Sequence, residues 1–448
     1  MHKFRQLWGY LRSNFWFTPS LIVVANIVFA EVMLAADYTG IDQWLARWPR
    51  LFGAGADGAR QMLSTLAGSM MAVMGITFSM TLVALALASS QYTSRILRTF
   101  MSSRVTQITL GLFAGNFAYC LVVLRTIHSG NVVFVPSLAV FFAFVLSLGS
   151  VGVLVFFIHH IASSIQASSI IASIAQDTIA ATERLFPERL GHGPDEDVDP
   201  NQELESLEGM RWYPVPAAVN GYIQSVDDDA LLRMAEDKKT IVRMEHGIGA
   251  FVVQNTTLVS LVLEDSPDQE TINVLNDAFT VTRHRTVEQD PAFGIRQLVD
   301  MALKALSPGV NDTSTAVMCV DYLTAILAQM ITREFPAPCR YEGDDLRAIT
   351  IAPTFEGLLA EAFDQIRGSA GGNVGIMARM LSALEILVDL TVSQRRRRAI
   401  RDQVQWLAEL AGRTIESEHE RERIAKRLME VREELEAQLV SNAGEERA

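Results

Sequence analysis

Cysteine is scarce in this chain, whose 448 residues include only Cys120, Cys319 and Cys339. Three widely spaced thiols are too few for a disulfide framework, and they lack the paired spacing of a cysteine-rich zinc site. Acidic residues are scarce too, but only at the front. Residues 1–175 carry four acids and ten Lys or Arg, whereas the rest carries 47 acids against 28 Lys or Arg, a net charge of −19. The chain therefore divides into an apolar, mildly basic front and a polar, acidic back.

Motifs of the common enzyme classes are also missing from the sequence. It contains no GxxxxGK[ST], HExxH, GxSxG or EF-hand loop. The GxGxxG match at Gly53–Gly58 falls between two apolar stretches, without the strand and helix that make such a loop a dinucleotide site. The net charge of −13 argues against a nucleic-acid partner, because phosphate contacts need clustered positive charge. We therefore expect no enzyme, no cofactor, no metal and no nucleic acid.

The front of the chain contains long apolar stretches. A bilayer core requires about 20 mostly apolar residues, and four stretches approach or exceed that length, at 17–36, 62–88, 108–124 and 132–158. The first is too long for a signal peptide, and three more follow it. The N-terminal tail and the loop after the second stretch hold six Lys or Arg against four in the other two loops, which favours an inside N-terminus. Four spans then place both termini in the cytoplasm.

Small residues recur along the second apolar stretch. Their spacings of three, four and seven keep them on one helix face, and they are Ser64, Gly68, Ala72, Gly75, Ser79, Ala86 and Ser90. Two interpretations fit this stripe. Small residues allow helices to pack closely in lipid, and a stripe that contains hydroxyl groups can instead border a pore or cavity.

Three polar residues interrupt the apolar stretches, namely Asn26, Glu31 and Asn116. Burying a polar group in a bilayer is costly, so such residues are candidates for function. Glu31 lies near the end of its stretch, from which it can reach the interface. Asn116 lies near the centre, where we expect a hydrogen bond between helices. No row of acidic residues crosses the membrane, which leaves a proton or cation pump without support.

The acidic back of the chain is expected to form a cytoplasmic α+β domain. Residues 1–180 would hold the four-helix membrane domain, with the fourth helix extending into the cytoplasm, and residues 181–210 have the acids and helix breakers of a linker. Residues 211–265, with β-branched runs and glycines, predict a small β-rich module. Residues 266–448 have helical periodicity, and the predicted helices are 269–280, 294–306, 313–331, 354–369, 374–391, 396–414 and 418–439.

Two groups of charged residues stand out in this helical region. Arg395–Arg398 with Arg401 predict a solvated helix face or, alternatively, contact with anionic lipid or phosphate. The second group surrounds the break at Pro308-Gly309 and consists of Asp290, Arg296, Asp300, Asn311 and Asp312. Capping of the next helix by Asn311, Asp312 or Thr313 explains most of it. A buried polar network, or an anion or metal site, is the alternative.

Three segments of the chain resemble the DUF2254 family of predicted bacterial membrane proteins. They are LVALALASSQYTSRILRTF (82–100), FFIHHIASSIQASSIIASIAQDT (156–178) and DPAFGIRQLVDMALKALSPGVNDTSTAV (290–317), and the resemblance covers nearly the whole chain. Thr93-Ser94-Arg95 stand where the family often has Ser-Pro-Arg, so the helix can continue without a proline kink. The resemblance implies a membrane location and no established activity, and we expect the membrane to be the bacterial inner membrane.

These patterns together predict a homo-oligomeric ion channel or pore-like protein, gated or modulated by its cytoplasmic domain. Four spans are too few to enclose a wide path in one chain, so a pore requires several copies around the second span. The alternative is a non-conducting membrane sensor or scaffold, whose cytoplasmic domain binds a ligand or partner. The expected partners are the lipid bilayer, other copies of the chain, and an ion or small ligand.

Overall fold

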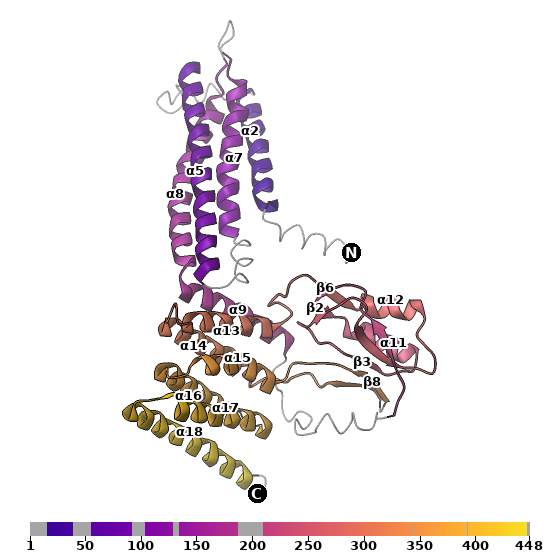
Figure 1. Ribbon diagram of the computed structural model, residues 1–448. Coiled ribbons are helices and arrows are strands. Elements are labelled where there is room, and N and C mark those ends of the chain that lie inside the picture. Colours follow the sequence, from indigo (N-terminus) through magenta and orange to yellow (C-terminus); the bar gives the residue numbers. More distant parts are fainter. Residues whose placement is uncertain are drawn as a thin grey trace. The chain divides into compact units, whose positions relative to one another are not determined.

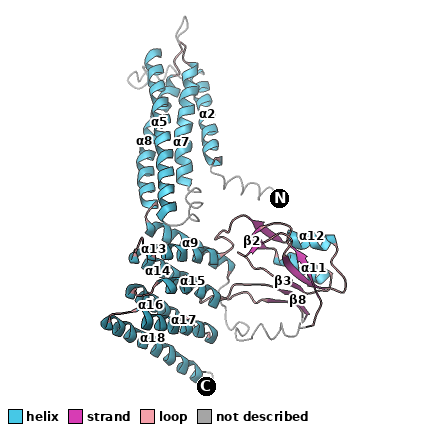
Figure 2. Ribbon diagram, viewed as in Figure 1, coloured by secondary structure: helices cyan, strands magenta, loops and turns pink. Residues whose placement is uncertain are grey.

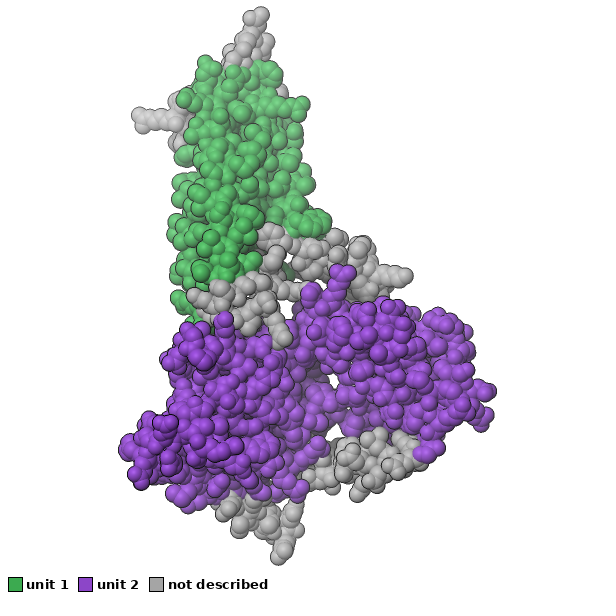
Figure 3. All heavy atoms as spheres, in the orientation of Figure 1, with its two compact units in different colours: residues 1–169 green, residues 170–448 purple. Residues whose placement is uncertain are grey.

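A computed structural model of the chain describes residues 16–38, 55–91, 104–128, 134–186, 209–343, 345–391 and 393–445. They belong to two compact units, residues 1–169 and 170–448, which Figure 3 shows in different colours. The first unit is helical, and the second combines helices with two small sheets (Figure 2). This confirms the predicted class, a mainly α membrane protein with an α+β region after the membrane helices. The predicted linker lies largely in 187–208, outside the described residues.

Four long helices dominate the first unit, and each is long and apolar enough to cross a membrane. They are α2 (Phe17–Tyr38), α5 (Ala56–Gln91), α7 (Arg104–Thr126) and α8 (Ser137–Ser164), as Figure 1 shows. The four predicted spans are therefore confirmed. α7 is the most enclosed of them, because α2, α5 and α8 all pack against it. Thr93-Ser94-Arg95 lie outside the described residues.

The interior of the first unit is filled with side chains. Tyr119 of α7 is fully buried there, and its hydroxyl donates a hydrogen bond to the Ala139 carbonyl of α8 at 3.0 Å. The ring of Phe29 from α2 lies 5.7 Å from the Tyr119 ring, and Leu63 of α5 is buried in the same cluster. In lipid, helices associate through van der Waals packing and polar contacts of this kind rather than through the hydrophobic effect.

The helix expected to continue the fourth span is divided by a short break. α8 ends at Ser164, and α9 (Ala167–Leu185) begins after Ile165 and Gln166. The Gln166 amide donates to the Ser163 carbonyl at 3.3 Å, three residues back instead of four. Serine hydroxyls compete with the helical backbone for hydrogen bonds, and serines flank the break on both sides. α9 is therefore a separate helix, most of which belongs to the second unit.

After α9, the second unit continues with a β-rich module. Its five-stranded sheet has the order β1-β5-β3-β8-β7, and its three-stranded sheet has the order β4-β2-β6. The strands are β1 (Trp212–Pro216), β2 (Gly221–Val226), β3 (Val242–Met244), β4 (Phe251–Val252), β5 (Thr257–Val262), β6 (Phe279–Thr282), β7 (Cys339–Glu342) and β8 (Asp345–Ile349). β6, β7 and β8 come from beyond residues 211–265, where the module was predicted. β8 joins the sheet by pairing in parallel with β3.

Two short helices, α11 (Asp228–Asp237) and α12 (Gln269–Asp277), pack against this module. The core between helices and strands is aliphatic, with Leu231 and Leu275 from the helices and Val242, Val259 and Leu261 from the strands. Removing such side chains from water is the main favourable term in folding. The module therefore has a hydrophobic core of its own.

The remaining helices of the second unit follow the predicted pattern closely. They are α13 (Pro291–Leu306), α14 (Thr313–Met330), α15 (Phe355–Ser369), α16 (Val374–Asp389), α17 (Gln394–Thr414) and α18 (Glu418–Glu445) (Figure 1). Side chains cap most of their N-termini, since Asp290, Asp312, Thr354, Asn373 and Ser393 each accept a hydrogen bond from an amide three residues on. Such caps satisfy amides that have no partner within the helix.

Candidate functional site

The face of α5 that carries the small residues points away from the other membrane helices. Six of the seven predicted positions are exposed, namely Ser64, Gly68, Ala72, Gly75, Ser79 and Ala86. The side chain of Ser90 lies outside those described. The opposite face of α5 is the buried one, with Leu63, Met70, Thr77 and Ala84 at a spacing of seven. Within the described chain, the small residues therefore do not serve the packing of α5 against α2, α7 or α8.

The glycines of this stripe have no close neighbours. A Cβ atom added at Gly68 or Gly75 would meet no described atom within 4 Å. Glycine inside a helix costs about 1 kcal/mol relative to alanine. The two glycines therefore weaken α5 without making a close contact in return with any described residue.

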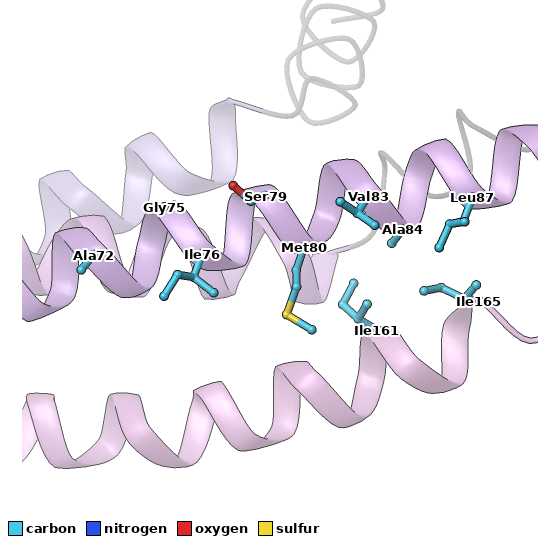
Figure 4. Close-up of a pocket in the computed structure, with 10 residues that line it drawn as sticks. All are labelled: Ala72, Gly75, Ile76, Ser79, Met80, Val83, Ala84, Leu87, Ile161 and Ile165. Atoms are coloured by element: carbon cyan, nitrogen blue, oxygen red, sulfur yellow. The ribbon is translucent and has the colours of Figure 1, made fainter.

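A groove of about 630 Å³ lies beside the stripe, between α5 and the end of α8 (Figure 4). Ala72, Gly75 and Ser79 form part of its α5 wall, and Ile161 and Ile165 come from the α8 side. The other lining residues are Ile76, Met80, Val83, Ala84 and Leu87. Ser79 carries the one hydroxyl among these ten residues, so the groove suits an apolar chain better than a hydrated ion.

Asn116 forms a polar contact in the middle of the first unit. Its Nδ2 donates to the Leu146 carbonyl of α8 at 3.1 Å and also to the Ser150 hydroxyl, which is the inter-helix hydrogen bond expected for it. Its Oδ1 and the Ser147 hydroxyl are buried and have no hydrogen-bond partner among the described residues. A polar atom buried without a partner costs free energy.

The other two intramembrane polar residues differ from Asn116. Asn26 donates from Nδ2 to the Ile22 carbonyl of its own helix at 2.9 Å, and its side chain lies against Gly115, beside Asn116. Glu31 is exposed on α2. The structure thus places Asn26 against Gly115 of α7, directs the Asn116 side chain to α8, and leaves Glu31 exposed.

Two glycines of α7 were missed by the sequence analysis, although they form a GxxxG pattern. A Cβ at Gly111 would lie 2.8 Å from Ile22 Cδ1, and a Cβ at Gly115 would lie 2.5 Å from Asn26 Nδ2. Both positions thus need glycine for α2 to approach α7 closely, which is how small residues act in membrane helices. The spacing Gly111-x-x-x-Gly115 was a readable signal.

Asp37 at the end of α2 was also missed. It is buried, and its two carboxylate oxygens accept hydrogen bonds from the Leu138 and Ala139 amides at 3.1 Å each. These amides belong to the first turn of α8, where backbone donors lack partners and the helix dipole favours negative charge. Asp37 therefore caps a helix distant in sequence and ties α2 to α8.

The predicted polar cluster of the second unit forms three separate groups. Asp290 caps α13 by accepting from the Phe293 amide at 3.2 Å, and it pairs with Arg285 at 2.7 Å. Arg296 pairs with Asp300 one turn on at 3.0 Å. Asp312 lies beyond the far end of α13, a helix of 16 residues and so about 24 Å long. No single site gathers all five residues.

Asp312 has the local role expected of a helix cap. It accepts from the Thr315 amide at 3.1 Å and from the Thr315 hydroxyl at 2.6 Å. These hydrogen bonds hold the pKa of Asp312 below its usual value. Asn311 beside it is exposed and has a positive φ of 49°, which asparagine tolerates better than most residues. Both residues are explained by the turn between α13 and α14.

Part of the predicted basic cluster is buried. Arg396 donates to the Ile331 and Arg333 carbonyls, and its guanidinium lies 5.3 Å from the Phe335 ring and 5.6 Å from the Phe355 ring. Arg397 is buried as well, and burial lowers the pKa of its guanidinium. The predicted solvated face is therefore wrong for these two arginines, and their burial also removes them from contact with lipid headgroups.

The described residues offer little for catalysis or metal binding. No three His, Cys, Asp or Glu side chains among them are grouped to hold a metal ion. The pKa of Asp177 on α9 is raised by burial and by the nearby Glu288 carboxylate, but neither residue adjoins a nucleophile in the contacts described. The most distinctive feature is thus the exposed small-residue face of α5 with its groove.

Comparison with known proteins agrees with the membrane assignment. Uncharacterised proteins of Mycobacterium tuberculosis and Mycobacterium bovis are each 28% identical to this chain over 437 residues, covering 94% of this chain and 80% of the relative. No solved structure matches the chain. A family model described as predicted membrane protein (DUF2254) matches residues 12–386. The chain therefore belongs to the DUF2254 family of predicted membrane proteins.

Proposed function

We propose that this chain is a subunit of a homo-oligomeric membrane channel, in which α5 borders a shared path and the C-terminal unit modulates it. The observation that supports this is the contrast between the exposed face of α5 and the exposed faces of α2 and α8. We also propose that the chain has no enzymatic activity. Its proposed location is the bacterial inner membrane, with both termini in the cytoplasm as the loop charges predict.

The exposed faces of α2 and α8 have the composition expected of lipid contact. They present large apolar side chains, including Leu21, Val24, Val28 and Val32 on α2 and Phe144, Leu148, Val151 and Val155 on α8. The first half of α5 instead exposes mostly small residues, with Met71 as a large apolar exception, and these are Ser64, Thr65, Gly68, Ser69, Ala72 and Gly75. Beyond Gly75, exposed Ile76, Phe78, Leu82 and Val83 return α5 to a lipid-like surface. Lipid gains little from small residues, whereas a second helix gains close packing.

A second copy of the chain is the simplest helix to fill this role. Most oligomers are symmetric assemblies of identical chains, and α5 stripes arranged around one axis would bring Ser64, Thr65 and Ser69 together. The hydroxyls of Thr65 and Ser69 donate within α5, to the Gln61 and Leu66 carbonyls at 2.8 Å each. Their oxygen lone pairs remain available to water or a cation. Such an axis would line a shared path with hydroxyl groups, whereas the interior of one chain is filled with side chains.

Cysteine crosslinking tests the assembly. All three native cysteines are buried, so an added surface cysteine is the reactive one. Gly68→Cys on the stripe should form disulfide-linked dimers in native membranes. Leu148→Cys, which is exposed on the lipid-like face of α8, is the matched control and should not. Equal crosslinking of the two variants, or none in either, contradicts the proposal.

Ion flux into liposomes tests conduction separately. The purified protein should pass ions, Gly75→Phe should reduce the flux, and Leu148→Phe should leave it unchanged. Crosslinked oligomers without flux would refute the channel and favour the second candidate, a non-conducting sensor or scaffold. The observation that favours this second candidate is the apolar lining of the groove beside the stripe, which does not attract ions.

A further inference from the structure

The groove between α5 and the end of α8 is lined by apolar side chains from two membrane helices. Figure 4 shows that Ile76, Met80 and Leu87 of α5 point toward α8, whereas Ile161 and Ile165 point back toward α5. The α5 residues recur at spacings of four and seven, which keep them on one face of the helix. The two helices therefore face each other across this space through apolar side chains.

The surroundings of this groove restrict what can fill it. α5 and α8 are apolar helices of a membrane protein, so the medium around the groove is hydrocarbon. A buried water needs roughly two to four polar partners, and Ser79 carries the one hydroxyl among the lining residues. An empty groove would deprive its lining of van der Waals contacts. The groove therefore takes either the acyl chain of a lipid or a helix from a second copy of the chain.

The size of the groove separates these two occupants. Its lining extends along α5 from Ala72 to Leu87, which corresponds to about 22 Å. A volume of about 630 Å³ over that length gives a mean cross-section of about 28 Å². A helix with its side chains is about 10–12 Å wide, and so about 80–110 Å² in cross-section. A methylene chain, which packs about 4 Å from its neighbours, needs roughly 20 Å². The groove is therefore wide enough for one acyl chain and too narrow for a helix.

We propose that the groove binds one acyl chain of a bilayer phospholipid, whose headgroup lies beyond Leu87 and Ile165. The sequence turns polar just after these two positions, at residues 89–91 and at Gln166, so this end of the groove lies near the membrane interface. The other end, at Ala72, lies in the middle of the α5 span. One leaflet of the hydrocarbon core is about 15 Å thick, so the groove accommodates a chain of that leaflet along its depth. The proposal requires neither self-association nor ion flux, and it does not depend on the proposed channel.

Photo-crosslinking in vesicles tests the proposal on the full chain. The probe is a phosphatidylethanolamine with a diazirine in one acyl chain, added to vesicles of phosphatidylethanolamine and phosphatidylglycerol, and mass spectrometry of peptides locates the adducts. Ile161 is the informative residue, because it lines the groove but is only 5% exposed, so that lipid on the outer surface does not reach it. Val155 of the same helix is 65% exposed and reports that outer lipid.

Both Ile161 and Val155 should form adducts in the parent protein. Met80→Trp places a larger side chain in the groove and should lower the Ile161 adducts by at least roughly fivefold, the factor that corresponds to the smallest usual cost of overpacking an apolar site. The Val155 adducts should not change. Val155→Trp, which adds the same ring to the outer face of α8, is the matched control and should leave the Ile161 adducts unchanged. Ile76→Trp fills the groove one turn away and replaces Met80→Trp if that variant does not fold.

Adducts on Val155 without adducts on Ile161 overturn the proposal, because protein then fills the groove. Ile161 adducts that persist when the groove is filled by tryptophan overturn it as well. The position of the diazirine tests the orientation, since a group near the ester should mark Ile165 and a group near the terminal methyl should mark Ala72. The reverse order contradicts a headgroup beyond Leu87. Loss or absence of ion flux changes none of these results, so the lipid site and the channel can fail separately.

Discussion

Removal of Asp37 should loosen the membrane unit even though this residue lies at the end of a helix. Asp37 supplies two hydrogen-bond acceptors to the first turn of α8, both at 3.1 Å. Replacing a capping side chain by alanine costs roughly 0.5–2 kcal/mol. Leaving buried donors unsatisfied costs roughly 1–3 kcal/mol for each group. Since water near the membrane interface can rescue part of this loss, we expect Asp37→Ala to destabilise the folded unit by about 2–3 kcal/mol.

The assay is reversible unfolding of purified protein in mixed micelles. Circular dichroism monitors the loss of helix as the fraction of denaturing detergent in the micelles is raised. Asp37→Asn keeps one neutral acceptor oxygen and should lose about half as much, because hydrogen bonds to charged groups are stronger than those to neutral ones. Ser20→Ala, exposed on the same helix, is the control and should stay within about 0.5 kcal/mol of the parent. An Asp37→Ala midpoint equal to that of the control would refute the idea that α2 caps α8.

Three further predictions concern other helices. Gly115→Val should destabilise the membrane unit by about 1–3 kcal/mol because its side chain would overlap Asn26, whereas Gly149→Ala, with no atom within 4 Å, should be neutral or slightly stabilising in the same assay. Asp312→Ala should cost about 1 kcal/mol near neutral pH. Because the folded pKa of Asp312 is lowered, the stability difference between parent and variant should be full above the unfolded pKa of about 3.9 and should be lost as the pH falls through the lower folded value. Stability measured against pH checks this, and a difference that persists in acid contradicts it. Cys319 is buried and its pKa is raised to about 12, so iodoacetamide should modify it at pH 8 only after unfolding, as mass spectrometry of the peptides would show.

The helices of this protein could be predicted from sequence because their signals are local. The four spans are long apolar runs, and each predicted helix of residues 266–448 begins within three residues of the observed start. Capping residues such as Asp312 and Asn373 mark those starts in the sequence itself. The sheets were harder, since β8 reaches β3 from far along the chain. No local pattern states which distant strand will be the neighbour, so the predicted module ended before β6, β7 and β8.

The side-chain roles at the candidate site were also hard to predict where they depend on residues distant in the sequence. Asp290 and Asp312 looked like members of one cluster because little sequence separates them, but α13 holds them about 24 Å apart. Arg396 and Arg397 looked solvated because arginine usually is. Their burial depends on Phe335, Phe355 and backbone carbonyls that the sequence does not place beside them. Side-chain roles that depend on tertiary neighbours could not be read in advance.

The glycines of α5 and α7 have different surroundings, and this difference bears on self-association. Gly111 and Gly115 of α7 are four residues apart and Gly68 and Gly75 of α5 are seven apart, so each pair lies on one helix face and sequence alone does not distinguish their roles. The structure separates them, because the α7 pair is pressed against α2 whereas the α5 pair faces no described atom within 4 Å. If close helix packing explains the first pair, the same physics leaves the second pair without a packing partner among the described residues, and a second copy of the chain is the partner we propose. Gly68→Leu should therefore leave the stability of the isolated monomer unchanged while it weakens self-association, measured by sedimentation in detergent. A monomer destabilised as strongly as Gly115→Val would show instead that α5 packs its small face within its own chain.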